Sequence, residues 1–550
     1  MIRKIPYLVL LGSTLITLVA QGREIIVQPP AQCTKSSPGV TLAPVCGLKA
    51  ALQQLRPGDT LRLRPGIYRQ PLDLRRAVGY SRARAIGSRA PPTRIEGPVR
   101  GSAIVSGARR VIGWKPLDRG VWVRPGWKIN SQQGFVDGKP LIQVGGLIWG
   151  GYPGNPASDL ARIRVPRGIW PGRIPGNASI LRPHQFFYDR SGQRLYLRLP
   201  RGQNPNHLQV LFAVHPYLLF ASGWDRLTVR RLSFRYSNTS AVSQAGAITL
   251  SGNYITLDHL RVEQVDSTGI SLAGDHNRIV HTRVIRAGRL GYNVRGRRVY
   301  LADDLAAYNN TRGFNKWWEA GGFKFVGNGG LRDSVVTRLR AIGNDGDGIW
   351  FDWKNRGDKL TNSLSAYNIG FGIHVEVSHD IRIEGNRVYG NGQRGISLAS
   401  SRNLRIMGNL VADNGLGGII SLNENRGAAT TPQKILVCAN LLAWNRGSAL
   451  TLPLPLAGSM ARNNVYLDAS GRPHLGLGKK VGLMGLAAWN RRYGQGRGSR
   501  AYAVSMPAKL AAILRAKQLI DWRRVLKDVG IASLPPLTAG CRDLPRGPLR

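Results

Sequence analysis

Two carboxylates in the middle of the chain are spaced as if by a repeating unit. Asp352 closes the segment GIWFD, and Glu376 closes the segment GIHVE 24 residues later. If these segments are neighbouring strands of one sheet, the two side chains share a face with Cβ atoms about 5 Å apart. Carboxyl groups about 5–5.5 Å apart suit glycoside hydrolysis with retention, in which one is the nucleophile and the other the general acid/base. Mutual repulsion raises the pKa of one group and so separates the two roles.

We therefore predict that Asp352 is the nucleophile and Glu376 the general acid/base. Asp347, in the preceding turn NDGDG, could replace either of them, and its larger separation from Glu376 would suit inversion. The competing interpretation is structural, because stacked acids on a solenoid are often solvated residues paired with arginine.

The same alignment gathers polar and aromatic side chains on this face. His374 aligns with Trp350, Lys324 of GGFKF aligns with Trp350 from the other side, and Ser397 follows His374. Tryptophan around the acids indicates a function, because an exposed tryptophan is costly unless it covers something. We predict that the substrate is bound by Glu319, Lys324, Trp350, Trp353, His374, Trp318 and Asn423. No Cys/His spacing indicates a metal site, and Ca²⁺ would be needed only if the acids faced an acidic substrate.

Asparagines repeat with the same period as the two acids. Asn344, Asn368, Asn391 and Asn414 are 24, 23 and 23 residues apart, and a second series comprises Asn362, Asn386 and Asn409. A fixed period of this length predicts stacked structural units, here a β-solenoid because each unit reads as strand, turn, strand. We expect the asparagines to turn inward at the corners, where they bond to the backbone and to each other. The expected inward stacks are Ile349, Phe351, Ile373, Val375, Ile396 and Leu398.

The periodic region has distinct flanks. Met1 to Ala20 read as a signal peptide, and Leu48, Leu52 and Leu55 indicate a short helix covering the first coil. FVDGKPLIQ and FFYDRSGQRLYLRL read as hairpins of an insertion, and residues 503–530 as an amphipathic helix pair covering the C-terminal end. We divide the chain into a signal peptide (1–20), a cap with first coils (21–84), an inserted β-rich subdomain (85–206), β-helix repeats (207–455) and a C-terminal cap with a helical tail (456–550).

The charge and the cysteines of the chain indicate which ligands and which compartment to expect. The net charge of +48 favours polyanions such as nucleic acid, an acidic polysaccharide or an anionic envelope surface. The basic residues, however, are mainly arginines spread along the chain, so we favour diffuse charge without a dedicated ligand over a specific polyanion ligand. No nucleic-acid reader motif occurs, and no segment beyond the signal peptide is apolar for long enough to span a membrane. We expect an exported protein, secreted or periplasmic, in which Cys33 and Cys46 could close a short loop. The oligomeric state is left open.

The segments WWEAGGFKF, GDGIWFD and GIHVEVS, in this order on successive coils, resemble secreted right-handed parallel β-helix proteins of the pectate-lyase-like superfold. The architecture is similar to that of β-helical glycoside hydrolases, including β-xylosidases, whose acids sit on successive coils. The resemblance implies an all-β, right-handed parallel β-helix that acts on a poly- or oligosaccharide without a cofactor, and it implies no particular sugar.

Two other functions compete with hydrolysis. A polysaccharide lyase or uronate C5-epimerase would use Lys324 or His374 as the base and arginine to neutralise the uronate, although a DPHD-type epimerase motif is absent. A non-catalytic surface protein would use the same face only to bind glycan.

Overall fold

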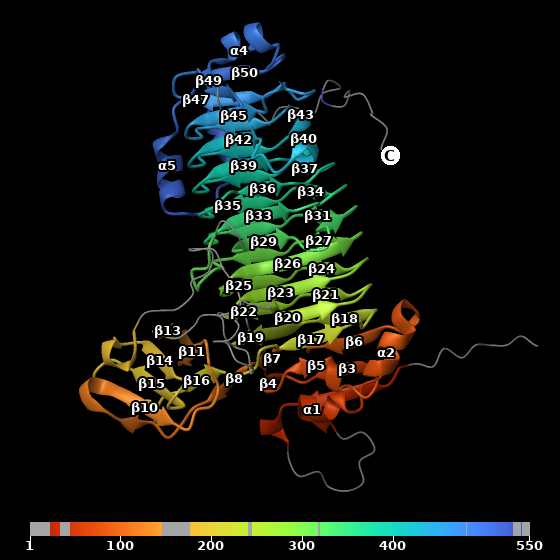
Figure 1. Ribbon diagram of the computed structural model, residues 1–550, viewed down its shortest axis with the longest axis vertical. Helices are drawn as coiled ribbons and strands as arrows, with labels where there is room; N and C mark the ends of the chain where they lie inside the picture. Colours follow the sequence, from red (N-terminus) through yellow and green to blue (C-terminus); the bar gives the residue numbers. More distant parts are fainter. Residues whose placement is uncertain are drawn as a thin grey trace, which may run out of the picture.

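Three long sheets of almost entirely parallel strands make up most of the molecule (Figure 1). The computed structural model describes residues 22–33, 44–145, 176–239, 245–316, 319–479, 481–531 and 541. We number the sheets 1, 2 and 3 in the order in which each coil passes through them. Within the described residues, sheets 1 and 3 have 14 strands each and sheet 2 has 13. Successive strands of a sheet come from successive coils, which makes the fold a parallel β-helix.

One coil contains β34 (Lys359–Thr361) of sheet 1, β35 (Leu364–Ala366) of sheet 2 and β36 (Ile373–Glu376) of sheet 3. The strands of sheet 3 around the candidate site are, in spatial order, β23 (Thr268–Ala273), β26 (Leu290–Arg297), β29 (Gly321–Phe325), β33 (Asp347–Asp352), β36, β39 (Arg394–Ala399) and β42 (Gly417–Leu422).

The core is a set of apolar stacks that runs along the helix axis. Alternate side chains of each sheet 3 strand point inward and pack on the residues one coil away. The predicted inward stack is confirmed, because all of its members are at most 1% exposed: Ile349, Phe351, Ile373, Val375, Ile396 and Leu398.

The first asparagine series forms the predicted ladder. The side-chain Nδ2 of Asn344 donates to Oδ1 of Asn368 (2.8 Å), and Asn368 donates in the same way to Asn391, and Asn391 to Asn414 (3.0 Å each). Each amide oxygen also accepts the backbone N–H of the preceding asparagine. Buried amide groups are thus satisfied at one corner of every coil, and this fixes the stacking of the coils.

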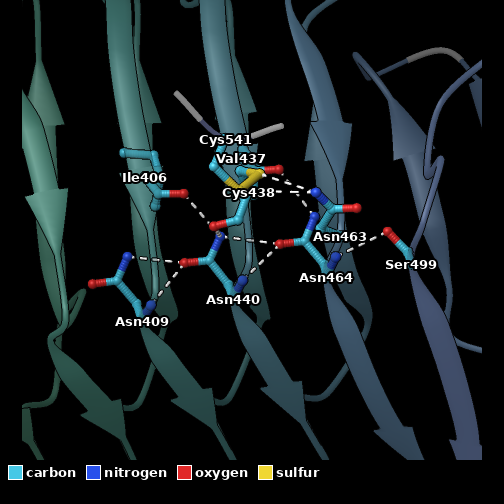
Figure 2. The surroundings of a disulfide bond; sticks show 9 residues. All are labelled: Ile406, Asn409, Val437, Cys438, Asn440, Asn463, Asn464, Ser499 and Cys541. Atoms are coloured by element: carbon cyan, nitrogen blue, oxygen red, sulfur yellow. Dashed lines mark hydrogen bonds between the residues drawn. A yellow bond between two sulfur atoms is a disulfide. The ribbon is translucent and has the colours of Figure 1, made fainter. Parts of the chain in front are cut away.

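The second ladder differs from the prediction at its first member. Asn386 donates to Asn409 as expected, and the series continues beyond the prediction, with Asn409 donating to Asn440 and Asn440 to Asn464. Figure 2 shows the last three of these asparagines. Asn362, however, is exposed at the adjacent corner position, and the buried Ser363 takes the ladder position by donating its backbone N–H to Asn386 Oδ1 (2.8 Å). The period alone does not distinguish neighbouring corner residues.

The N-terminal end is closed as predicted. The helix α1 (Gly47–Leu52) buries Leu48 and Leu52 against the first coils. Disulfides join Cys33 to Cys46 and Cys438 to Cys541; Figure 2 shows the second, beside the ladder of Asn440 and Asn464. The predicted signal peptide lies outside the described residues. Within the part of the chain that the structure describes, no helix is long and apolar enough to cross a membrane.

The inserted subdomain is real, but its predicted boundaries were wrong. β6 (Thr93–Glu96) and β7 (Ala103–Ser106) still belong to sheets 1 and 2, because their strands pair with neighbouring coils. The subdomain strands lie beside the first coils in Figure 1. They are β8 (Ala108–Arg110), β9 (Lys115–Pro116), β10 (Val121–Pro125), β11 (Gly134–Val136), β12 (Lys139–Pro140), β13 (Ile142–Gln143), β14 (Gln185–Asp189), β15 (Arg194–Arg198) and β16 (Val210–Ala213).

Both predicted hairpins of the subdomain are confirmed. β11 pairs antiparallel with β12, and β14 with β15. Trp114 and Trp127 are buried in the apolar core of this subdomain together with Phe212, so they serve its packing rather than a ligand.

The C-terminal region also differs from the prediction. Coils continue beyond residue 455, because β47 (Val465–Asp468) and β50 (Arg500–Ala503) extend sheet 2. The helices α5 (Ala508–Arg515) and α6 (Trp522–Asp528) occur where predicted, yet they do not cover the end. They pack on the outer side of sheet 2, over Tyr389 and neighbouring apolar residues, and α5 lies beside the coils in Figure 1. The end is instead occupied by α4 (Leu486–Tyr493), whose Trp489 is buried in the main core.

We predict that Asn391→Ala lowers the free energy of unfolding by roughly 2–4 kcal/mol, because it leaves buried donors and acceptors of Asn368, Asn414 and Ser365 without partners. Guanidinium unfolding followed by circular dichroism measures the change. Asn490→Ala, at an exposed position of α4, is the matched control and should change stability by less than about 0.5 kcal/mol. Equal stability of the two variants would contradict a ladder that holds the coils together.

Candidate functional site

The predicted register of the two acids is confirmed. Asp352 at the end of β33 lies directly opposite Glu376 at the end of β36, and Trp350 lies opposite His374. Lys324 lies opposite Trp350 from β29, and Ser397 opposite His374 from β39. All of these side chains alternate with the inward stacks and so project from the outer face of sheet 3. The structure therefore brings the two acids together with a lysine, a histidine and a tryptophan.

Lys324 compensates the charge of Asp352. Its ammonium lies 3.0 Å from Asp352 Oδ2 and 3.5 Å from the centre of the Trp350 ring. Although it projects outward, Lys324 is only 2% exposed. We predicted that Lys324 binds the substrate, and in the structure its ammonium forms an ion pair with Asp352.

Glu376 lies in a different environment from Asp352. It is 7% exposed, and its carboxylate accepts a hydrogen bond from Arg426 at 2.7 Å. Burial raises the pKa of Glu376; His374 and Arg426 lower this pKa, and Asp352 on the neighbouring strand adds to the rise. Two carboxyl groups in register thus differ in their surroundings, since Asp352 is compensated by a lysine while burial favours the protonated form of Glu376.

Asp347, the alternative catalytic carboxylate of the sequence analysis, has partners for both of its oxygens. It is the first residue of β33 and is 2% exposed. One carboxylate oxygen accepts the backbone N–H of Phe371 (2.8 Å), and the other lies 2.9 Å from Nδ1 of His374. Because both oxygens are engaged, Asp347 fixes the orientation of the imidazole, and Nε2 of His374 is the nitrogen left to act on a ligand.

Aromatic rings enclose His374 and its neighbours. Trp350 stacks on the imidazole with ring centroids 5.0 Å apart, and Phe371 contacts it edge-on at 4.8 Å. The expectation that Trp350 is exposed was wrong, because it is 3% exposed between Lys324 and His374. Trp353, by contrast, is 45% exposed at the strand end beside Asp352, so it is available to a ligand. The predicted Trp318 lies outside the described residues.

Glu319 belongs to a buried ion pair one coil before the acids. Its carboxylate accepts a hydrogen bond from Arg289 at 2.6 Å, and Arg289 also donates to Thr268 (2.9 Å). Arg289 is fully buried, and burial lowers its pKa. Glu319 therefore compensates Arg289 rather than standing free for substrate, and sequence reasoning missed this arginine.

Asn423 does not lie at a sheet 3 position in register with Asp352 and Glu376. In sheet 3 the positions after Glu376 are Ala399 and then Leu422, and Asn423 follows Leu422 in the loop, where it accepts the backbone N–H of Asn425. The residue that reaches Glu376 from this loop is Arg426. A signal for it exists in the sequence, because the asparagine ladder steps by 31 residues from Asn414 to Asn445 instead of 23, which marks an insertion of 31 − 23 = 8 residues.

Two buried polar atoms on this face lack a hydrogen-bond partner among the residues that the structure describes. They are the indole Nε1 of Trp350 and the amide Oδ1 of Asn293, which lies opposite Lys324. A buried donor or acceptor without a partner lowers the stability of the folded protein. A hydroxyl group can accept from a donor such as Nε1 of Trp350 or donate to an acceptor such as Oδ1 of Asn293.

Comparison with known proteins supports the fold. Residues 326–430, about a fifth of the chain, match the model of a family described as periplasmic copper-binding protein (NosD). Curated protein sequences give no significant match. The structure of XylC in complex with xylose is similar with a TM-score of 0.56 at 14% identity, covering 83% of this chain and 86% of that one. The chain is a right-handed parallel β-helix.

Other solved structures match more distantly. A glycoside hydrolase aligns with a TM-score of 0.41 at 13% identity, covering 92% of this chain and all of that one. The A-module of the mannuronan C-5 epimerase AlgE6 from Azotobacter vinelandii aligns with a TM-score of 0.32 at 13% identity, covering 46% of this chain and 72% of that one.

We predict that Glu376→Gln makes the protein more stable than the wild type at neutral pH. Because the folded-state pKa of Glu376 is raised, the stability that its protonated form provides is complete below the ordinary glutamate range and is lost as pH rises through the folded pKa. The difference in unfolding free energy should therefore be near zero at pH 4 and grow towards pH 7. Denaturant unfolding across this range measures it. Glu384→Gln on sheet 1 is the control. A Glu376→Gln advantage that is independent of pH, or absent, would contradict the assigned environment.

Proposed function

We propose that the protein is a retaining glycoside hydrolase that acts on a poly- or oligosaccharide. The observation that supports this most directly is the pair of carboxyl groups in register on adjacent strands with opposite surroundings. Strand spacing gives the Cβ atoms of the two acids a separation of about 5 Å, which supports carboxyl groups close enough for a retaining enzyme. Lys324 compensates Asp352, and burial raises the pKa of Glu376.

In this proposal Glu376 is the general acid and Asp352 the nucleophile. Glu376 gives its proton to the glycosidic oxygen as the bond to the anomeric carbon breaks, and Asp352 attacks that carbon to form a glycosyl ester. The carboxylate of Glu376 then removes a proton from water, which attacks the anomeric carbon and releases Asp352. Lys324 compensates the charge of Asp352 at the start and end of the cycle. No cofactor is needed for either step.

The remaining groups of the face are suited to sugar hydroxyls. The buried Nε1 of Trp350 can donate to one hydroxyl and Oδ1 of Asn293 can accept from another. Nε2 of His374 faces away from Asp347 and can bond a third, while the exposed Trp353 offers a flat apolar surface for a sugar ring. These contacts favour a neutral glycan, and Arg426 can bind an acidic substituent beside Glu376. We further propose that the protein is exported, since two disulfides suit an oxidising compartment.

We predict that Glu376→Gln lowers kcat by roughly 10²–10⁴-fold on a glycoside with a poor leaving group, because the general acid is lost. The loss should be much smaller on aryl glycosides whose leaving group needs no proton. Asp352→Asn should abolish turnover of both substrates. A panel of oligosaccharides and aryl glycosides measures these rates, and proton NMR of the first product determines the anomer, which should be retained.

Glu384→Gln is the matched control and should keep the wild-type rates. Wild-type turnover that survives both site substitutions would refute the carboxylate pair as the catalytic groups. Release of unsaturated uronate from alginate or pectin would favour a lyase that uses His374 as base. Binding of glycans by the wild type and both variants, with no turnover of any substrate, would mean a non-catalytic binding protein.

A further inference from the structure

Two histidines and an aspartate converge far from the candidate site, at the corner between sheets 1 and 2. Asp258 ends β21 (Thr256–Asp258) and His259 follows it. His281 follows β24 (Arg278–Val280) on the next coil. Because Asp258 pairs with Val280, the residue before His281, the two histidines occupy equivalent corner positions one coil apart. Their rings lie 4.5 Å apart.

The ligand-type atoms of these residues point at one another. Nδ1 of His259 lies 2.6 Å and Nδ1 of His281 lies 3.2 Å from the same oxygen, Oδ1 of Asp258. In all, the three donor atoms lie within 4.8 Å of one another. Two imidazole nitrogens and one carboxylate oxygen that face a common point form a donor set rather than a dispersed charged surface.

A second carboxylate, that of Asp303, lies on the side of the His281 ring that faces away from Asp258. Oδ2 of Asp303, on the third coil, lies 3.9 Å from Nε2 of His281, the ring nitrogen that faces away from Asp258. Asp303 is held in turn by Arg338, which donates to both of its oxygens at 2.8 and 2.7 Å, and this hydrogen bonding lowers the pKa of Asp303. Metal-binding histidines commonly have a carboxylate on the nitrogen that does not bind the metal. When a metal replaces the proton on Nδ1 of His281, Nε2 carries the ring proton and faces Oδ2 of Asp303, and their separation of 3.9 Å must shorten to make a hydrogen bond.

We propose that Asp258, His259 and His281 bind a divalent transition-metal ion, with Asp303 as the residue that orients His281. Two nitrogens and one oxygen suit Zn²⁺, Cu²⁺ or Ni²⁺ better than Ca²⁺ or Mg²⁺, which prefer oxygen ligands. This proposal does not depend on the hydrolase proposal, and none of these residues lies in residues 326–430, where the family model matches.

The side chains must adjust to hold such an ion, because the donor atoms lie within 4.8 Å of one another and not yet at the distances that a metal sets. Tetrahedral ligands at about 2.0–2.1 Å from zinc are about 3.3 Å apart. The His281–Asp258 separation of 3.2 Å already agrees with this value, and the His259–Asp258 pair must open by about 0.7 Å when the metal replaces the shared proton. The side chain of His259 is 59% exposed and can make this movement. The exposure also leaves the remaining coordination position open to water.

The net charge of the chain does not exclude a cation here. The charge of +48 is spread along the chain, and at physiological ionic strength charges beyond about 8–10 Å are largely screened. Asp258 provides the local negative charge within the donor set, while the charge of the neighbouring Asp303 is compensated by Arg338.

Titration of the full-length protein with Zn²⁺ by isothermal calorimetry tests the site. We expect one class of Zn²⁺ sites in the wild type that is lost or weakened at least tenfold in His281→Ala and in Asp258→Asn. Asp303→Asn should weaken it by about tenfold, as for other residues that orient a ligand. His276→Ala is the matched control, because His276 is a surface histidine of the preceding turn that stacks on Tyr254 instead. Circular dichroism should show that every variant is folded.

Cu²⁺ provides an independent readout. Its electron paramagnetic resonance spectrum should show coupling to two nitrogens in the wild type and in His276→Ala, and to fewer in His259→Ala and His281→Ala. Equal Zn²⁺ affinity and stoichiometry in the wild type and His281→Ala would overturn the proposal. So would a Cu²⁺ spectrum that neither His259→Ala nor His281→Ala changes, or tighter binding of Ca²⁺ than of Zn²⁺.

Discussion

The fixed register between successive coils is the constraint on which the rest of the structure depends. Parallel pairing brings a residue to within about 5 Å of its counterpart one coil later, and a one-residue slip would turn every side chain of a strand to the other face. Inward stacks such as Phe351 and Val375 resist a slip because it would expose them, and the buried amides of Asn368 and Asn391 would lose their partners. Both the candidate hydrolytic site and the proposed metal site consist of residues that this register brings together from neighbouring coils.

The outer face of sheet 3 carries charges that a purely structural surface would not bury. Lys324 pairs with Asp352, Arg426 with Glu376 and Arg289 with Glu319, and in each pair at least one side chain is nearly inaccessible. Burying an ion pair seldom adds stability, since desolvation offsets much of the attraction. These pairs, together with Nε1 of Trp350, which has no partner among the residues that the structure describes, are the features that led us to propose a ligand-binding face. Part of the desolvation cost is the free energy of unfolding that is lost when Glu376, whose pKa is raised, becomes ionised as the pH rises.

The sequence was sufficient to predict the fold because the repeat is visible in residue types. The period of the asparagines and of the Gly-apolar strand starts predicted the sheet 3 register of Asp352, Glu376, Trp350 and His374 correctly. Periodicity says which residues are neighbours but not how deeply they are buried, so Trp350 and Lys324 were expected at the surface. It also failed to show that Asp347 is fully engaged by His374 and the backbone N–H of Phe371.

Residues outside the repeat were the hardest to predict. Arg426 and Glu319 come from loops that interrupt the period, and a loop's contacts depend on packing that no spacing rule gives. The boundaries of the inserted subdomain were wrong because β6 and β7 have little of the later repeats' pattern although they pair with the coils. Asp258, His259 and His281 were overlooked because their convergence depends on corner geometry, not on a motif.

In the proposed mechanism Asp352 is the carboxylate that bonds to the sugar, while Glu376 moves the proton. Trapping with 2-deoxy-2-fluoro glycosides, followed by mass spectrometry of proteolytic peptides, tests it most directly, using a glycoside of a sugar that the wild type is found to hydrolyse. We expect a single glycosyl label on the peptide that contains Asp352. A label on Glu376 or Asp347, or none on an enzyme that turns over the parent glycoside with inversion, would contradict it.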